Sequence, residues 1–268
     1  NYNIKIVTWC CIVLLAALPI IPIILRSKGF EDEVVDWFSW AGYLSLGFFV
    51  LTFLAVVTKD LIYLVIGLLT KITAAIGSPS SPTDPGRRDF IQKILSISIV
   101  TTTSVSTIAG LYAARKGATI MKTTVPIKGL DKDLSGMTIA QVSDLHIGST
   151  IKKGYVEEVV DQVNRLNPDI IAITGDLVDS SVGYLSKHVE PIKDLHANIG
   201  KYFVTGNHEY YSGVDQWLEK TDQYGLTNLI DSHEIIMKGS GSITLGGVTD
   251  YRSSSIKPEH KSNPATAF

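Results

Sequence analysis

The sequence is poor in cysteine and nearly balanced in charge. Its 268 residues include only two cysteines, Cys10 and Cys11, which are adjacent in an apolar run. Adjacent cysteines cannot staple distant segments together, so a disulfide framework is excluded. The formal net charge is -2, and a charge so close to zero excludes a strongly basic nucleic-acid-binding domain. We therefore expect no nucleic-acid partner.

Charged residues are also scarce in the first 116 residues, where long apolar runs dominate. Such runs are long enough, or nearly so, to cross a bilayer core of roughly 30 Å. Pro19 and Pro22 would kink the first run, and Trp37 and Trp40 stand where an interfacial aromatic belt would lie. The alternative is a helical bundle in water, but the first three runs have almost no polar face. We predict a transmembrane region over 1–116 with about four helices, at 4–25, 37–57, 61–76 and 91–114.

A stretch rich in Ser and Pro, 77–86, separates the third and fourth runs and is typical of a loop. Arg87 and Arg88 follow it directly, and with Lys93 they resemble a twin-arginine export signal. The alternative is ordinary positive charge on the cytoplasmic flank of a span. Both interpretations put the chain after Lys122 outside the cytoplasm, although the basic pair after the fourth run argues for the reverse. We expect an integral protein of the cell membrane whose C-terminal part lies on the non-cytoplasmic side.

From residue 136 onward the chain alternates short β-branched runs with amphipathic stretches. Strands alternating with helices are typical of an α/β layered domain. After a linker at 117–135 we therefore predict such a domain over 136–268. Its expected strands are 137–143, which looks buried, 169–174, 201–205, 235–237 and 242–248, and its expected helices are 155–166, 182–195 and 214–224.

Each of the first three predicted strands ends in a short polar loop. In open α/β sheets the carboxyl ends of the strands are where ligands bind, so the three loops should converge on one edge of the sheet. Carboxylate, imidazole and amide oxygen ligands suit divalent metals such as Mn, Fe or Zn. Glycines in the second and third loops predict tight turns that aim the next side chain into the site. The loops read Asp144-Leu145-His146, Gly175-Asp176-Leu177-Val178-Asp179 and Gly206-Asn207-His208-Glu209.

In this order, each behind a predicted strand, the loops resemble the motifs of the calcineurin-like metallophosphoesterase superfamily. Its pattern Asp-X-His, Gly-Asp-X-X-Asp and Gly-Asn-His-(Asp/Glu) is present in full, and the resemblance covers about residue 137 to the end. The region before it is similar to a membrane-attached, bacterial-type branch. The resemblance implies transmembrane α-helices followed by an αββα sandwich that is incomplete at its C-terminus. It also implies a phosphoesterase or pyrophosphatase that uses two divalent metal ions, Mn, Fe or Zn.

The resemblance assigns a role to each motif residue. Asp144 and His146 would bind the first metal, and Asp176 would bridge both metals. Asn207 would bind the second metal through its amide oxygen. A bridge between two cations roughly 3.5–4 Å apart needs an anionic ligand with two oxygens, which agrees with the role of Asp176. His208 would not bind metal, and would instead act as the catalytic residue that approaches the phosphoryl group.

Two departures from the family refine these expectations. Asp179 is followed by Ser180 rather than by the Arg-Gly of the protein phosphatases, so we expect a small or lipid-linked phosphoester as substrate. Asp179 and Glu209 are candidates for supporting the ligands, and the alternative for Asp179 is to cap the next helix. The later histidine motifs of the family are missing, since His233 and His260 do not stand in such motifs. We therefore expect a chain that is C-terminally truncated, or else a degenerate relative.

These observations favour a membrane-tethered hydrolase of phosphoester or pyrophosphate bonds whose partners are the lipid bilayer and a phosphorylated substrate. The alternative is a catalytically inactive, phosphoesterase-like binding domain on a membrane protein. A transporter with an appended domain is a weaker hypothesis, because the predicted spans carry little charge beyond Lys5. With the later histidines missing, we expect the chain to bind at most one metal tightly and to hydrolyse p-nitrophenyl phosphate poorly.

Overall fold

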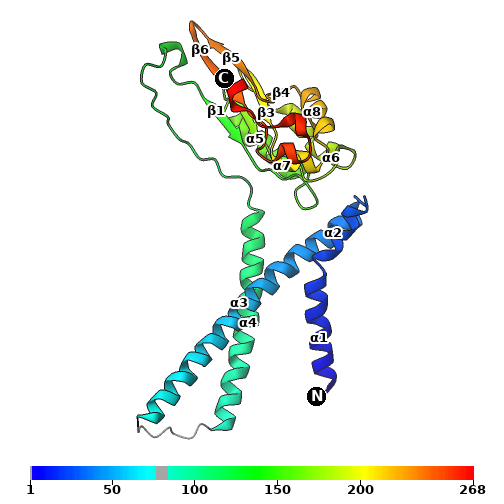
Figure 1. The fold of residues 1–268 in the computed structure, drawn as a ribbon, viewed down its shortest axis with the longest axis vertical. Coiled ribbons are helices and arrows are strands. Elements are labelled where there is room, and N and C mark those ends of the chain that lie inside the picture. The colour runs from blue at the N-terminus through cyan, green and yellow to red at the C-terminus, as the bar shows by residue number, and fades with distance from the viewer. Residues whose placement is uncertain (1, 77–83) are drawn as a thin grey trace. The chain divides into compact units, whose positions relative to one another are not determined.

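The computed structural model describes residues 2–76 and 84–268 (Figure 1). The chain divides into two compact units, Asn1–Phe30 with Val34–Lys116 and Glu31–Glu33 with Gly117–Phe268. Most of the predicted loop 77–86 lies outside the described residues.

The first unit is made of helices whose apolar side chains point outward. Pro19 stands between α1 and α2, where the two helices are bent by 42°, so the kink predicted there is confirmed. Helices α3 and α4 are each long and apolar enough to cross a membrane, and the bent pair would make one further span. The helices are α1 (Tyr2–Ala17), α2 (Ile20–Ser27), α3 (Glu33–Ala75) and α4 (Pro85–Ala114).

One helix, α3, contains both of the spans that were predicted at 37–57 and 61–76. The polar residues Thr58, Lys59 and Asp60 between those spans do not interrupt it. None of them is a glycine or a proline, and the Lys59 ammonium pairs with the Asp60 carboxylate over 3.1 Å. The expectation of two separate helices here is therefore corrected to one helix of 43 residues.

A four-stranded parallel sheet forms the centre of the second unit, in the order β1-β2-β3-β4 (Figure 1). A separate antiparallel pair, β5 and β6, forms a second sheet within the described residues. The strands are β1 (Ile139–Val142), β2 (Ile170–Thr174), β3 (Gly200–Val204), β4 (Thr227–Asn228), β5 (Ser232–Lys238) and β6 (Gly241–Gly247).

The helices that follow the strands confirm the α/β layered class. The helix predicted at 182–195 divides into α6 and a 3-10 segment, because Pro191 cannot continue the α-helical hydrogen bonds. The α-helices of this unit are α5 (Lys153–Arg165), α6 (Val182–Val189), α7 (Asn207–Tyr211) and α8 (Val214–Gln223). Its 3-10 helices are Lys132–Leu134, Glu190–Asp194, Ser253–Ser255, Pro258–His260 and Pro264–Thr266.

The core of the second unit lies between the parallel sheet and its helices. The face of α5 that was predicted to be apolar is buried at Val156, Val159, Val160 and Val163. β2 lies between two strands and is buried on both faces, as parallel strands usually are. β1 differs, because it is an edge strand with alternating exposure and Ile139 is 51% exposed. The expectation that β1 is wholly buried is therefore wrong.

Candidate metal centre

The polar loops leave one edge of the parallel sheet, and the first two are joined through their backbones. The His146 amide donates to the Asp176 carbonyl oxygen over 2.9 Å, and the Asp179 amide donates to the Ile147 carbonyl oxygen over 2.9 Å. A parallel bridge between Ile147 and Val178 continues the pairing beyond the ends of β1 and β2. The first two motifs are thus fixed to one another by main-chain hydrogen bonds.

The backbone is strained at three of the motif residues. Asp144, His146 and Asp176 have φ angles of 56°, 46° and 51°, in the left-handed region that side-chain-bearing residues rarely adopt. Such strain persists only where the surrounding structure holds it, and it gathers at functional sites. These φ angles change the direction of the backbone in the loops that follow β1 and β2.

The two motif glycines serve different purposes. Gly175 has a φ of 79°, so the turn predicted there is confirmed. Gly206 has a φ of -92°, which any residue can adopt. A Cβ atom at Gly206 would instead clash with the carboxylate of Asp176. The glycine at 206 therefore makes room for the Asp176 carboxylate of the neighbouring loop, a role that the sequence did not predict.

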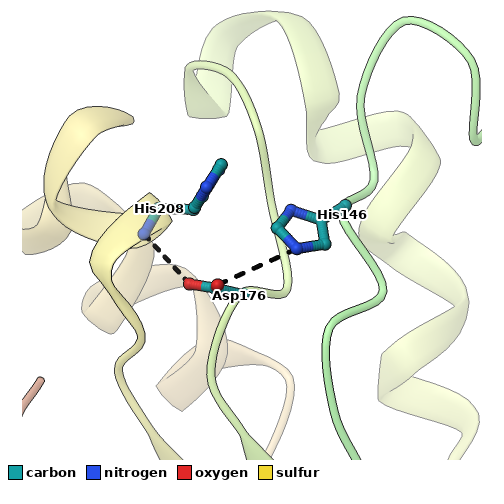
Figure 2. A group of neighbouring side chains, drawn as sticks. All are labelled: His146, Asp176 and His208. Carbon is teal, nitrogen blue, oxygen red and sulfur yellow. Dashed lines mark hydrogen bonds and ion pairs between the residues drawn. The ribbon is translucent and has the colours of Figure 1, made fainter. Parts of the chain in front are cut away.

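Three side chains, from the loops after β1 and β2 and from the start of α7, meet at this edge (Figure 2). One potential ligand atom from each of His146, Asp176 and His208 lies within 4.8 Å of the others. The Nε2 atom of His146 is 3.8 Å from Asp176 Oδ2 and 3.8 Å from Asp144 Oδ1. The structure therefore brings together four of the five residues that were singled out as site residues. The fifth, Asn207, is the first residue of α7 and lies next to His208 in the chain.

Asp179 is shared by the two histidines of the cluster. Its Oδ1 atom lies 2.8 Å from His146 Nδ1 and 2.7 Å from His208 Nδ1. An ionised carboxylate only accepts hydrogen bonds, so both Nδ1 atoms donate and both Nε2 atoms are free to bind a metal or act on a substrate. The N-cap position of α6 is occupied by Ser181 and not by Asp179. Of the two roles considered for Asp179, the structure therefore favours support of the site over helix capping.

The carboxylates around His146 shift its pKa. Burial alone lowers the pKa of His146, but the hydrogen bond and charge of Asp179 outweigh it, helped by the charges of Asp176 and Asp144. The net effect raises the pKa of His146. Three carboxylates at one imidazole concentrate negative charge in a small volume, which is an environment that attracts a cation.

Glu209 lies behind the cluster and is 0% exposed. It accepts hydrogen bonds from backbone amides on both sides of the site. Burial raises the pKa of Glu209, and the hydrogen bonds from the amides of Gly206, Leu177 and Asp176 oppose that rise. Its carboxylate is therefore bonded to the protein backbone and does not belong to the cluster of His146, Asp176 and His208.

The two tyrosines after the third motif have different environments. Tyr210 is buried, and its hydroxyl lies 3.3 Å from Thr205 Oγ1 and 2.9 Å from His260 Nδ1. Tyr211 is 60% exposed, and its ring packs edge-on against His208 with centroids 5.6 Å apart. Only Tyr211 is thus placed at the mouth of the site.

The donor set fits a divalent cation. The cluster offers imidazole Nε2 atoms together with the carboxylates of Asp144 and Asp176. Among the ion pairs of the described residues, these two carboxylates meet the imidazole of His146 and no lysine or arginine. Nitrogen and oxygen donors of this kind suit Mn, Fe and Zn. Among the described residues, His233 and His260 do not belong to the cluster.

Comparisons with known proteins agree with this geometry. The calcineurin-like phosphoesterase family matches residues 137–263. A transmembrane protein with metallophosphoesterase domain from Danio rerio is 30% identical over 236 residues, which cover 85% of this chain and 52% of that protein. A metallophosphoesterase of Helicobacter pylori is 35% identical over 142 residues, 53% of this chain and 36% of its own length.

A third relative has a named substrate. The UDP-2,3-diacylglucosamine pyrophosphatase LpxG of Chlamydia trachomatis is 30% identical over 100 residues, covering 37% of this chain and 29% of that protein. The chain thus spans about half or less of the length of these three relatives. Its long apolar helices and its transmembrane relatives make it a membrane-associated protein. Residues 137–263 of the chain thus form a calcineurin-like phosphoesterase domain.

Proposed function

We propose that this domain hydrolyses phosphoester or pyrophosphate bonds with two divalent metal ions. Asp144 and His146 would hold the first ion, Asp176 would be shared by both ions, and Asn207 would hold the second. The observation that carries the proposal is the convergence of His146, Asp176 and His208 within 4.8 Å. When bound, Mn, Fe or Zn would supply a Lewis acid and an acidified water molecule.

The side chains of this chain divide the remaining tasks. Asp179 holds the Nδ1 protons of both histidines, which leaves Nε2 of His146 as a lone-pair donor for the metal. His208 is the catalytic residue, and its Nε2 atom approaches the phosphoryl group to stabilise developing charge or to protonate the leaving oxygen. The ring of Tyr211, which packs against His208, is 60% exposed, so a substrate can reach this side of the site from solvent.

The substrate we propose is a small or lipid-linked phosphorylated molecule. The named activity of the chlamydial relative, a pyrophosphatase of a diacylated nucleotide sugar, supports this choice. Attachment to a membrane also supports it, because a tethered enzyme meets a lipid substrate at its own surface. Ser180 follows Asp179 where protein phosphatases have an arginine, which argues against phosphoprotein substrates.

Hydrolysis of a generic ester tests the proposal. We expect the chain, purified in detergent with Mn²⁺, to release p-nitrophenol from p-nitrophenyl phosphate or its diester only slowly, because the later histidine motifs of the family are missing from it. His208→Gln should lower kcat by about 100-fold or more. The matched control is His196→Gln, since His196 is exposed and bonds to the Asp194 carbonyl instead of to the cluster. Binding of Mn²⁺ without hydrolysis would instead support the inactive, phosphoesterase-like binding domain.

The orientation of the domain is a separate proposal. Arg87 and Arg88 lie in the first turns of α4, ahead of its apolar stretch. Positive charge at this end favours a cytoplasmic start for the helix and a non-cytoplasmic phosphoesterase domain. A reporter that works only outside the cytoplasm, fused after Lys122, should be active. Neutral replacements of both arginines should weaken its signal, and activity of a cytoplasm-only reporter would reverse the topology.

A further inference from the structure

Glu209 is a buried carboxylate that accepts hydrogen bonds from four backbone amides. Its Oε2 atom accepts from the amides of Gly206 at 2.7 Å and Asp176 at 3.0 Å. Its Oε1 atom accepts from the amides of Leu177 at 2.8 Å and Val178 at 3.3 Å. Both oxygens of the carboxylate are therefore fully engaged by main-chain N–H groups.

Helix capping accounts for only one of these four bonds. The bond from Gly206 closes the first turn of α7, three residues before Glu209, as an acidic residue at the third helical position commonly does. The other three donors belong to the loop after β2, and the first of them is 33 residues away in the chain. Glu209 thus joins the second motif loop to the third.

Each of the two segments has a carboxylate that accepts a hydrogen bond from a backbone amide of the other. Glu209 on α7 accepts from the amide of Asp176, while Asp176 Oδ1 accepts from the amide of His208 at 3.0 Å. Asp176 is therefore held at its main chain and at its side chain by the same short helix. This double hold stabilises the left-handed φ of 51° at Asp176.

We infer that Glu209 is the positioning residue that fixes the bridging carboxylate Asp176 relative to His208. This inference rests on the proposed function, in which Asp176 bridges the metals. Leu177 and Val178 are 1% and 0% exposed, so without Glu209 their amides would stay buried without an acceptor. The loop would then relax, and the ligand atoms of Asp176 and His146 would separate.

The most informative substitution is Glu209→Gln, which keeps the size of the side chain. Its amide oxygen can still accept two of the four N–H groups, but its NH₂ group must face the other two donors. Glu209→Asp keeps the charge with a shorter reach, and the family pattern also allows Asp at this position. The expected order of metal affinity is wild type, then Glu209→Asp, then Glu209→Gln.

Calorimetric titration of the full chain with Mn²⁺ in detergent measures this order. We expect Glu209→Gln to raise the dissociation constant by about 10–100-fold, with Glu209→Asp in between. The control is Thr221→Val, because Thr221 is also 0% exposed and bonds to Asn228 Oδ1 at 2.8 Å, away from the cluster. It should lower the melting temperature and leave the affinity unchanged. An equal loss of affinity in Thr221→Val would overturn the inference.

Hydrogen exchange without metal gives a second measurement that does not depend on the proposed function. Peptides containing residues 175–178 should exchange at least about tenfold faster in Glu209→Gln, while peptides of β2 stay protected. Unchanged exchange together with unchanged Mn²⁺ affinity would refute the positioning role. A different result would be faster exchange in Glu209→Gln together with no Mn²⁺ binding by the wild-type chain. It would support the role of Glu209 in joining the two loops and would refute the metal site. If Glu209→Gln does not fold, the same two measurements on Glu209→Asp decide the question.

Discussion

The two units of this chain use the same apolar residues in opposite ways. On α3, Leu64 and Ile66 are 58% and 50% exposed, whereas Ile170 and Ile171 of β2 are 0% exposed. Exposed apolar surface costs about 25 cal/mol per Å² in water, so the first unit is stable only where lipid or detergent covers it. Burial must therefore be judged against the solvent that each unit meets.

Carboxylates differ between the units in a more informative way. Asp60 on α3 and Asp144 after β1 have the same side-chain exposure, 65%. Asp60 pairs with Lys59, which neutralises it, while Asp144 lies with Asp176 around one imidazole. Neighbours, rather than exposure, make one of these residues a candidate metal ligand.

The largest expected difference between the units concerns metal binding. Asp176→Asn should lower the Mn²⁺ affinity by at least about 100-fold, because the bridging ligand loses its charge. Asp60→Asn, the matched change in the first unit, should leave the affinity unchanged. Metal content by elemental analysis after gel filtration checks both variants. If Asp176→Asn still held a full complement of metal, Asp176 would not be the residue that bridges the ions.

A second difference concerns packing. Ile171→Ala should destabilise the phosphoesterase domain by about 2–5 kcal/mol, because it leaves a cavity in a core that cannot fully collapse. Ile66→Ala on α3 removes the same atoms from a side chain that is 50% exposed and should change little. Thermal melting of the two variants in detergent compares them. Equal melting temperatures would mean that the apolar residues of α3 pack as a protein core does.

The smallest expected effect concerns an ion pair at the rim of the domain. The Lys238 ammonium bonds to Asp169 Oδ2 at 2.9 Å and, with the Thr138 amide, holds the pKa of Asp169 below its ordinary value. A lowered pKa stabilises the fold at neutral pH, and this stabilisation is lost as the pH falls through that lowered value. Asp169→Asn should therefore cost about 1–2 kcal/mol at pH 7 and nothing in strong acid.

Urea unfolding at pH 7 and in strong acid, at about pH 1–2, measures that prediction. The exposed residue Asp161 on α5 offers the control Asp161→Asn, which should unfold like the wild type at both pH values. A loss of stability in Asp169→Asn that is the same at both pH values would show that the ion pair is not its cause.

Much of the second unit could be predicted from sequence because its signals are local. β-branched runs marked the strands, valine spacing marked α5, and the motif residues follow the strand ends as expected. The role of Gly206 was missed, because it depends on a side chain 30 positions earlier. Glu209 was expected to support the ligands, but its four hydrogen bonds were not foreseen, because three of the four donors come from another loop.

The first unit was predicted less well at its boundaries. A polar triplet at 58–60 suggested a break, but helix α3 continues through it. Hydropathy indicates which segments lipid can cover, but it does not mark where a helix ends. A break within a helix needs a residue, such as proline, that disrupts the backbone hydrogen bonds. The absence of glycine and proline at 58–60 was the signal that favoured one helix. Pro19, by contrast, marks a real break between α1 and α2.

Pulsed electron paramagnetic resonance of bound Mn²⁺ tests most directly whether the strand-end loops form one metal centre. The spin echo of Mn²⁺ is modulated by the nitrogen of a coordinated imidazole. We predict this modulation in the wild-type chain and in His196→Gln, and its loss in His146→Gln. His208→Gln should keep it, because His208 acts on the substrate and not on the metal. Modulation that survives in His146→Gln, or that disappears in His208→Gln, would contradict the assignment of the ligands.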